Sequence, residues 1–236
     1  MASSRLEHLS RFYGLMGMLE GKLGGARRLR ECSSPMSWPT RGIYFFQEPG
    51  EARTTSGTGP RIVRVGTHAV KAGSRARLWD RLKQHRGSVS SSGGNHRGSI
   101  FRLIVGTALV KREGLEFPTW GTCRGGVPRE IREHELKLEQ AVSNVIGAMP
   151  FLWLAIEDEA GPASLRGYIE RNSIALLSNH GKKAIDPPSR AWLGHHCDRE
   201  KVRAAGLWNS NHVDERYDPT FIDTLAGLIE QAGSHN

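Results

Sequence analysis

Arginine and histidine side chains repeat at helical spacing in one basic segment of the chain. Arg77, Arg81 and His85 follow one another at four-residue steps, so in a helix they project from one face. The planar guanidinium of Arg81 matches the geometry of a phosphate, and an imidazole one turn later can hydrogen-bond that phosphate or relay a proton. The spacing alone also fits a solvated helix face. It points to phosphate chemistry only together with the elements around it.

Positive charge is concentrated around these residues. Between Arg61 and Arg102, ten Lys or Arg stand against the single acid Asp80, a local charge of +9 that equals the net charge of the whole 236-residue chain. A concentrated positive field attracts a polyanion. The sequence offers no strongly amphipathic basic helix and no apolar run of about 18 residues, so a nucleic acid is favoured over a membrane as the partner.

The composition is that of a folded protein from a reducing compartment. Hydrophobic residues make up 38% of the chain and charged residues 24%, as in ordinary globular domains. The three cysteines, Cys32, Cys123 and Cys197, are far apart and form no Cys-x-x-Cys pair. This spacing argues against a disulfide framework and predicts a cytoplasmic protein. Residues 12–23 are interrupted by glycines and a glutamate, so we expect no cleaved signal peptide.

Two strands are expected to position the basic helix. Residues 42–47 and 61–67 are rich in β-branched and aromatic side chains, which predicts a hairpin whose long loop comprises residues 48–60. We expect Ser74 to cap the helix that follows and Gly87 to end it.

The other segments predict further helices and strands around this hairpin. A loose helical pattern in residues 6–30 is broken at Gly24-Gly25, and we expect it to pack on the main domain rather than to clamp DNA with its basic end. Residues 87–99 read as a basic loop. Strands are expected over residues 99–110 and 151–156. Helices are expected over residues 128–149, 162–179 and 219–231.

The hairpin resembles the start of the GIY-YIG nuclease family. Gly42-Ile43-Tyr44 matches the first motif of that family letter for letter, and Arg64-Val65-Gly66 stands where its second motif should be, on the paired strand. Two features depart from the family pattern. Arg64 replaces the tyrosine of the second motif, and the hairpin is longer than is usual in the family.

The resemblance continues along the chain to about residue 180. Arg81 is similar to the catalytic arginine of the family, and His85 is similar to the histidine that many members carry one turn later. The predicted strand over residues 151–156, followed by a helix with Glu170 and then by Asn179, is similar to the metal-binding glutamate helix and its downstream asparagine.

The family resemblance implies a magnesium-dependent nuclease. Tyr44 would take part in activating the attacking water, Arg81 and His85 would bind the phosphate, and Glu170 would hold Mg²⁺ as a hard oxygen ligand. With the neighbouring basic residues, the candidates for contact with nucleic acid are Gly42, Arg64, Arg77, Lys83, Arg86, Arg97 and Asn179.

Several of these residues have structural alternatives. Tyr44 could be a core tyrosine, and Asn179 could cap the C-terminus of a helix. The acids at positions 157–159 rival Glu170, but we favour a solvated turn for them. His195-His196-Cys197 has irregular spacing for zinc, and a surface turn is favoured. Polar residues of the tail (Asn209, Asn211 and His212) could read DNA bases, but we expect the tail to pack on the core through Trp192 and Trp208.

These observations predict an α/β fold in which a small mixed or antiparallel sheet is flanked by helices. Residues 1–40 would form an N-terminal helical arm and linker, residues 41–180 the nuclease domain, and residues 181–236 a C-terminal extension. The predicted function is that of a metal-dependent DNA endonuclease, of restriction or defence type because no second module is visible. The alternatives are an inactive nucleic-acid-binding module on the same scaffold and a nuclease that acts on RNA. The sequence leaves the oligomeric state open.

Overall fold

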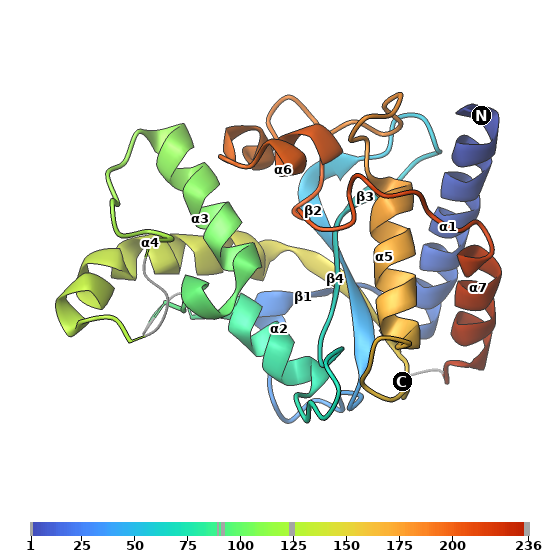
Figure 1. Cartoon of the computed structure of the whole chain (residues 1–236), viewed down its shortest axis with the longest axis horizontal. Coiled ribbons are helices and arrows are strands. Elements are labelled where there is room, and N and C mark those ends of the chain that lie inside the picture. Colours follow the sequence, from blue (N-terminus) through green and yellow to red (C-terminus); the bar gives the residue numbers. More distant parts are fainter. Residues whose placement is uncertain (1, 89, 91–92, 123–125, 234–236) are drawn as a thin grey trace.

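A small antiparallel sheet forms the centre of the protein. The computed structural model describes residues 2–88, 90, 93–122 and 126–233, and within them four strands pair antiparallel in the order β1-β4-β2-β3 (Figure 1). The strands are β1 (Arg27–Arg28), β2 (Gly42–Ala52), β3 (Pro60–Thr67) and β4 (Pro150–Ala155). The predicted strands at 42–47, 61–67 and 151–156 are confirmed. The hairpin loop is shorter than predicted because β2 extends to Ala52, and β1 was missed.

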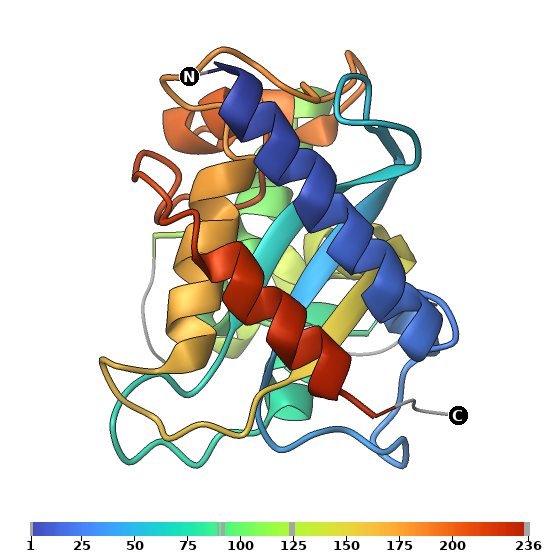
Figure 2. The same ribbon diagram turned by 90° about the vertical axis from the view of Figure 1, so that its right-hand side faces the viewer.

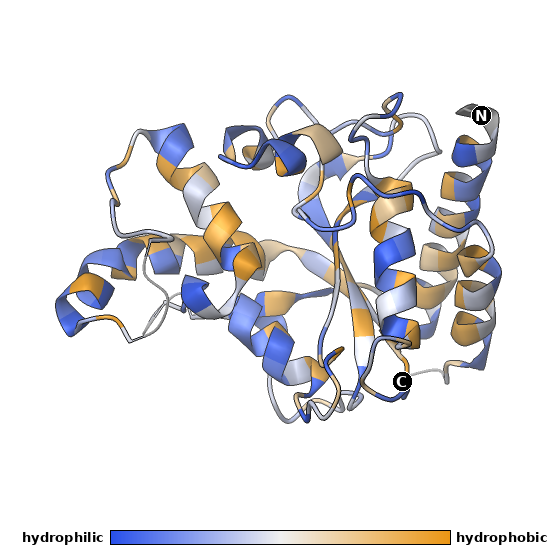
Figure 3. Cartoon of the chain, viewed as in Figure 1, coloured by the Kyte–Doolittle hydropathy of each residue, from blue (hydrophilic) through white to orange (hydrophobic). Residues whose placement is uncertain are grey.

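Helices cover both sides of this sheet, as predicted for the fold class. Helices α1, α5 and α7 lie on one side, and α2, α3 and α4 lie on the other (Figures 1 and 2). The α-helices are α1 (Ala2–Lys22), α2 (Leu78–Arg86), α3 (Ile100–Glu113), α4 (Arg129–Ala148), α5 (Leu165–Leu177), α6 (Glu200–Ala205) and α7 (Phe221–Gln231). Short 3₁₀ helices span Leu29–Glu31, His96–Gly98 and Leu193–His196. Hydrophilic residues dominate the outer end of α4 (Figure 3). No helix of the described residues is long and apolar enough to cross a membrane.

Side chains of β2 alternate between the two helical layers. The Phe45 ring packs against Phe12 of α1, with ring centroids 6.0 Å apart, whereas Phe46 packs against Phe101 of α3 at 5.5 Å. Successive residues of a strand point to opposite faces. Tyr44 therefore shares the face of Phe46, towards α2 and α3, and contacts it edge-on at 5.5 Å.

The predicted strand over residues 99–110 is wrong, because helix α3 occupies Ile100–Glu113. Ser99 caps α3 by accepting a hydrogen bond from the Arg102 N–H, and Gly114 ends the helix in a left-handed conformation with φ of 62°. The near-continuous apolar run concealed a helical period. Its members are buried at steps of three and four residues: Phe101, Ile104, Val105, Ala108 and Leu109.

Helix α2 begins three residues later than predicted. Ser74 is not its cap, because the first helical residue is Leu78 and the Asp80 carboxylate accepts a hydrogen bond from the Arg77 N–H at 3.0 Å. Gly87 ends the helix as predicted, with φ of 58°. Arg77 is thus the residue before the helix and not part of the face that carries Arg81.

The C-terminal segment packs on the sheet through its tryptophans, as predicted. The Trp208 N–H donates to the Val63 carbonyl at 2.7 Å. The Asn209 side chain accepts from the Val65 N–H at 3.1 Å and donates to the Val65 carbonyl at 2.9 Å. The indole N–H groups of Trp192 and Trp208 both donate to Glu48 Oε2, at 3.0 and 2.8 Å. Residues 192–209 are therefore fixed to both β2 and β3.

Glu48 should make stability depend on pH. Burial raises the pKa of its carboxyl above the usual value, although the two indole donors oppose the shift. A carboxyl whose pKa is higher in the folded state stabilises the fold fully below its unfolded pKa, and this contribution is lost as the pH rises through the folded pKa. Glu48→Gln keeps an acceptor oxygen but cannot ionise. We expect it to raise Tm at pH 8 by about 2 °C and to leave Tm nearly unchanged at pH 4, measured by thermal unfolding. Equal shifts at both pH values would contradict this origin.

Two cysteines are buried free thiols. Cys32 and Cys197 are 1% and 0% exposed, and neither forms a disulfide. Cys123 lies outside the described residues, as do residues 89, 91 and 92 of the predicted basic loop. The described part of that loop includes a turn of 3₁₀ helix in which His96 is buried.

Candidate active site

Two motif glycines allow the strands and a tyrosine ring to approach closely. Tyr44 of β2 pairs with Gly66 of β3, and a Cβ placed on Gly66 would lie 2.4 Å from Tyr44 Oη. A Cβ on Gly42 would lie 2.5 Å from the Leu154 carbonyl oxygen on β4. The glycines of both motifs are thus required by packing, and Gly42 contacts a neighbouring strand rather than an open surface.

A chain of buried hydrogen bonds links Tyr44 to α2 and α3. Tyr44 Oη lies 2.8 Å from His85 Nε2, and His85 Nδ1 lies 2.7 Å from Ser99 Oγ. Burial lowers the pKa of His85 well below its ordinary value, and the charges of Arg81 and Arg64 act in the same direction. The imidazole is therefore neutral at neutral pH. In that state one ring nitrogen donates and the other accepts, so His85 connects two hydroxyl groups.

Arg64, which occupies the position of the second motif tyrosine, is buried beneath the site. Its guanidinium carbon lies 4.6 Å from the centre of the Phe101 ring, and its Nη1 donates to the Trp208 carbonyl. Burial lowers the pKa of Arg64, whereas Tyr44 and Glu170 raise it. The arginine therefore places a positive charge next to both groups instead of a second phenol.

Glu170 reaches the site from the opposite helical layer. It lies on α5, and its Oε1 accepts a hydrogen bond at 3.1 Å from the Thr67 N–H at the end of β3. Burial raises the pKa of the Glu170 carboxyl, while Arg64 and the Thr67 N–H oppose this shift. No described donor is bonded to Oε2, so one carboxylate oxygen is available to a cation.

The donor set fits a magnesium ion. Among the described residues, no three His, Cys, Asp or Glu side chains gather as a metal cage. Mg²⁺ does not need one, since it retains several waters and binds through one or two carboxylates together with substrate phosphates. Glu170 supplies such a carboxylate beside Arg64 and Arg81.

A cavity of about 400 Å³ joins these groups. From the sheet and its helices it is lined by Tyr44, Arg64, Thr67, Arg81 and Glu170. Its other wall comes from the C-terminal segment: Arg199, Trp208, Asn209, Ser210, Asn211 and His212. Sequence reasoning missed Arg199 and Ser210 and considered Asn211 and His212 only as base readers. Nothing in the local sequence marks a wall that forms through contacts between distant residues.

Basic residues on α2, and Arg77 just before it, differ in their exposure and in their contacts with the protein. Arg81 is half-buried, and its Nη1 donates to Gln84 Oε1 and the Gly98 carbonyl, both at 3.1 Å. Arg77 and Lys83 are exposed. Arg86 donates to the Cys32 carbonyl, and its guanidinium carbon lies 5.4 Å from the centre of the Trp79 ring. Arg81 is the α2 residue that enters the cavity.

Two other sequence candidates do not line the cavity. Arg97 forms two hydrogen bonds with the Glu135 carboxylate, at 2.7 and 2.9 Å. Asn179 follows α5, and its Oδ1 accepts from the Arg5 guanidinium at 3.1 Å and from the Ile185 N–H at 3.0 Å. Both residues stabilise their own surroundings in this structure.

The rival acids after β4 are also occupied. Glu157 Oε1 accepts from the Arg41 N–H at 3.1 Å, and Asp158 is paired with Arg166. The Arg166 interaction holds the pKa of Asp158 below its usual range even though burial opposes this shift. These acids stabilise the turn after the strand, in agreement with the interpretation favoured from the sequence.

Comparison with known proteins identifies the family. Residues 3–235 match the model of the GIY-YIG domain family. No curated protein and no solved structure gave a match. The match extends over α1 and the C-terminal segment as well as the motif residues. The chain therefore belongs to the GIY-YIG domain family, whose scaffold is that of a nuclease.

Proposed function

We propose that this protein is a metal-dependent DNA endonuclease that hydrolyses phosphodiester bonds. One observation carries the proposal. A single cavity is lined by Tyr44, by the guanidinium of Arg81 and by Glu170, which has a carboxylate oxygen without a described donor. His85 is buried behind Tyr44 and bonded to its hydroxyl. Hydrolysis of a phosphodiester requires an oriented water, positive charge at the developing phosphorane and stabilisation of the leaving oxygen. The cavity offers a group for each requirement.

Tyr44 and His85 act together on the attacking water. Because the pKa of His85 is low, its imidazole is neutral at neutral pH, with one donor and one acceptor nitrogen. In the tautomer that we propose, Nδ1 donates to Ser99 Oγ and Nε2 accepts a hydrogen bond from Tyr44 Oη. This leaves the lone pairs of the phenol oxygen to accept a hydrogen bond from the water and orient it. Arg81 binds the scissile phosphate with its planar fork. Mg²⁺, when bound through Glu170, would supply further positive charge at the phosphorane and the leaving 3′ oxygen.

DNA is the proposed substrate because of the charge of the surrounding segment. Arg77 and Lys83 remain exposed next to the cavity-facing Arg81 and can contact neighbouring phosphates. We propose a restriction or genome-defence role in the cytoplasm, where the buried thiols of Cys32 and Cys197 would stay reduced. Arg64 in the place of the second motif tyrosine is the observation that favours the alternative, a binding module without catalysis.

The deciding experiment uses purified protein with supercoiled plasmid and with methylated and unmethylated phage DNA. We expect nicking or linearisation with Mg²⁺, none with EDTA, and recovery when excess Mg²⁺ is returned. Cutting of unmethylated DNA alone would support a restriction role. Binding that depends on salt without cleavage of any DNA would support the binding module instead. Tighter binding of RNA than of duplex DNA at matched salt would indicate that RNA, and not DNA, is the substrate.

A further inference from the structure

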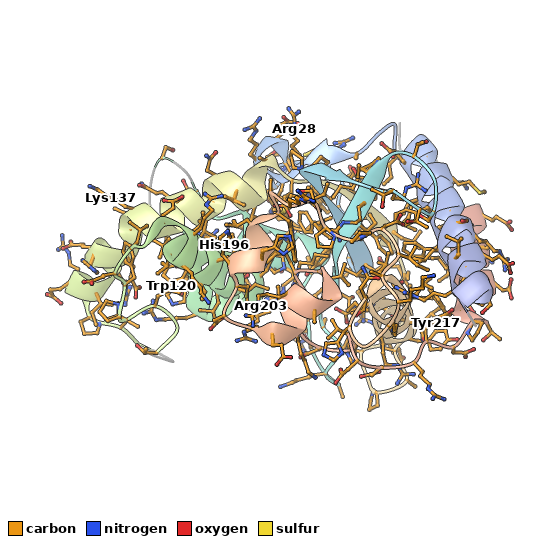
Figure 4. The ribbon with its side chains drawn as sticks, turned by 90° about the horizontal axis from the view of Figure 1, so that it is seen from above. Arg28, Trp120, Lys137, His196, Arg203 and Tyr217 are labelled. Carbon is orange, nitrogen blue, oxygen red and sulfur yellow. The ribbon has the colours of Figure 1, made fainter. Side chains whose placement is uncertain are left out.

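The C-terminal segment contributes two basic residues to the cavity lining, Arg199 and His212. Arg199 lies immediately before α6, which Figure 1 shows on the same side of the sheet as α2 but at its other end. Figure 4 labels His196, the last residue of the 3₁₀ helix before α6, and Arg203 of α6 itself. Arg81 and Arg199 thus enter one cavity from separate elements.

The charge of the cavity is not balanced by protein groups. Arg64, Arg81 and Arg199 line it together with a single carboxylate, Glu170. Four other well-buried arginine side chains are paired with acids, in the pairs Arg61–Glu51, Arg97–Glu135, Arg102–Glu139 and Arg166–Asp158. Buried Arg5 instead donates to three backbone carbonyls and Asn179 Oδ1. Among the described residues, no acid forms an ion pair with Arg81 or Arg199. An excess of guanidinium groups in a concave site is suited to an anionic ligand.

The Arg199 side chain is held only weakly by the protein. Its one described side-chain hydrogen bond runs from Nη1 to Ser210 Oγ at 3.4 Å, a long bond by the usual criteria. The side chain is half-buried, so part of its hydration is already lost. A guanidinium in this state gains more from a phosphate than a fully solvated one does.

We infer that Arg199 is a second phosphate-binding residue, which grips the phosphodiester backbone of the substrate together with Arg81. The inference rests on the proposed function for the identity of the anion. It goes beyond the motif residues, because Arg199 lies outside the segment that carries them. The C-terminal segment then contributes directly to substrate binding as well as to the fold.

The test is DNA binding without cleavage. Affinity of Arg199→Gln for a duplex oligonucleotide is measured by fluorescence anisotropy in EDTA across a salt series. We expect Kd to rise about tenfold at low salt. The negative slope of the logarithm of the association constant against the logarithm of the salt concentration should become shallower by roughly one, as expected for one lost phosphate contact. Arg199→Lys should keep the slope but recover only part of the affinity, because lysine lacks the planar fork.

Lys201→Gln provides the matched control. Lys201 lies two residues away on α6, is paired with Asp214 at 2.7 Å and does not line the cavity. The Lys201→Gln substitution removes one positive charge, as Arg199→Gln does, and we expect it to change Kd by less than twofold. Equal effects of the two variants, or unchanged affinity in Arg199→Gln, would overturn the inference. If the wild-type protein cuts no DNA, that result contradicts the nuclease proposal alone. The binding measurements then still test the role of Arg199.

Discussion

Glu170→Gln is expected to abolish metal-dependent DNA cleavage, with a loss of roughly 10³-fold or more in rate, while DNA affinity is retained. The amide is nearly isosteric and can still accept the Thr67 N–H at 3.1 Å. It carries no charge, so it binds Mg²⁺ poorly. In EDTA the affinity for DNA should be equal or up to about threefold tighter, since a negative charge next to the phosphate site is removed.

Glu159→Gln is the control for this variant. Glu159 is an exposed acid of the turn after β4, where a rival metal ligand was considered from the sequence. We expect its cleavage rate to be within twofold of wild type. The comparison is made from initial rates of plasmid nicking over a range of Mg²⁺ concentrations. Persistent cleavage by Glu170→Gln, or its loss in Glu159→Gln, would show that the metal is held elsewhere.

Tyr44→Phe should lower the cleavage rate by about 10² to 10⁴-fold, the usual range for loss of an acid–base group. The ring contacts with Phe46 and His85 are kept. The variant loses the hydroxyl that would orient the water, and His85 Nε2 loses its partner at 2.8 Å. An unpaired buried nitrogen costs about 1–3 kcal/mol of stability, so single-turnover rates should be measured well below the Tm of the variant.

Tyr13→Phe separates chemistry from stability in this experiment. Tyr13 is also buried, and its Oη accepts a hydrogen bond from the Ile62 N–H at 3.2 Å. It lies on α1 and does not line the cavity. We expect a similar loss of Tm with a nearly normal cleavage rate. Parallel loss of activity in both variants would mean that Tyr44 acts through the fold alone.

Sequence reasoning succeeded where the information is local. The hairpin and α4 followed from side-chain types and periodicity, and Gly87 followed from the need for a left-handed residue at a helix end. The relation of Tyr44 to His85 was accessible although 41 positions separate them, because both residues match motif positions of the family. The bond at 2.8 Å between them supports the relay considered from the motif residues.

The errors have two causes, an ambiguous hydrophobic pattern and contacts between distant residues. A run that is apolar at almost every position does not distinguish a buried strand from a buried helix, and in the structure this run is α3, capped by Ser99. The ion pair of Arg97 with Glu135 and the bond of Asn179 to Arg5 join residues far apart in the chain. The same is true of Arg199, which reaches the cavity only because Trp208 and Asn209 attach the tail to β3.

The attachments along β3 also govern how copies of this chain can associate. An unpaired outer strand normally offers its backbone groups to a strand of another molecule, which promotes aggregation or sheet extension. In this protein, several outward-facing backbone groups of β3 already have partners. The backbone N–H of Trp208 donates to the Val63 carbonyl, the Asn209 side chain bonds the N–H and the carbonyl of Val65, and Glu170 accepts from the Thr67 N–H. The opposite outer strand, β1, has only two residues. The groups that build the cavity therefore also cover the outer edge of β3 from Val63 to Thr67, so a strand of another copy cannot pair there without displacing them.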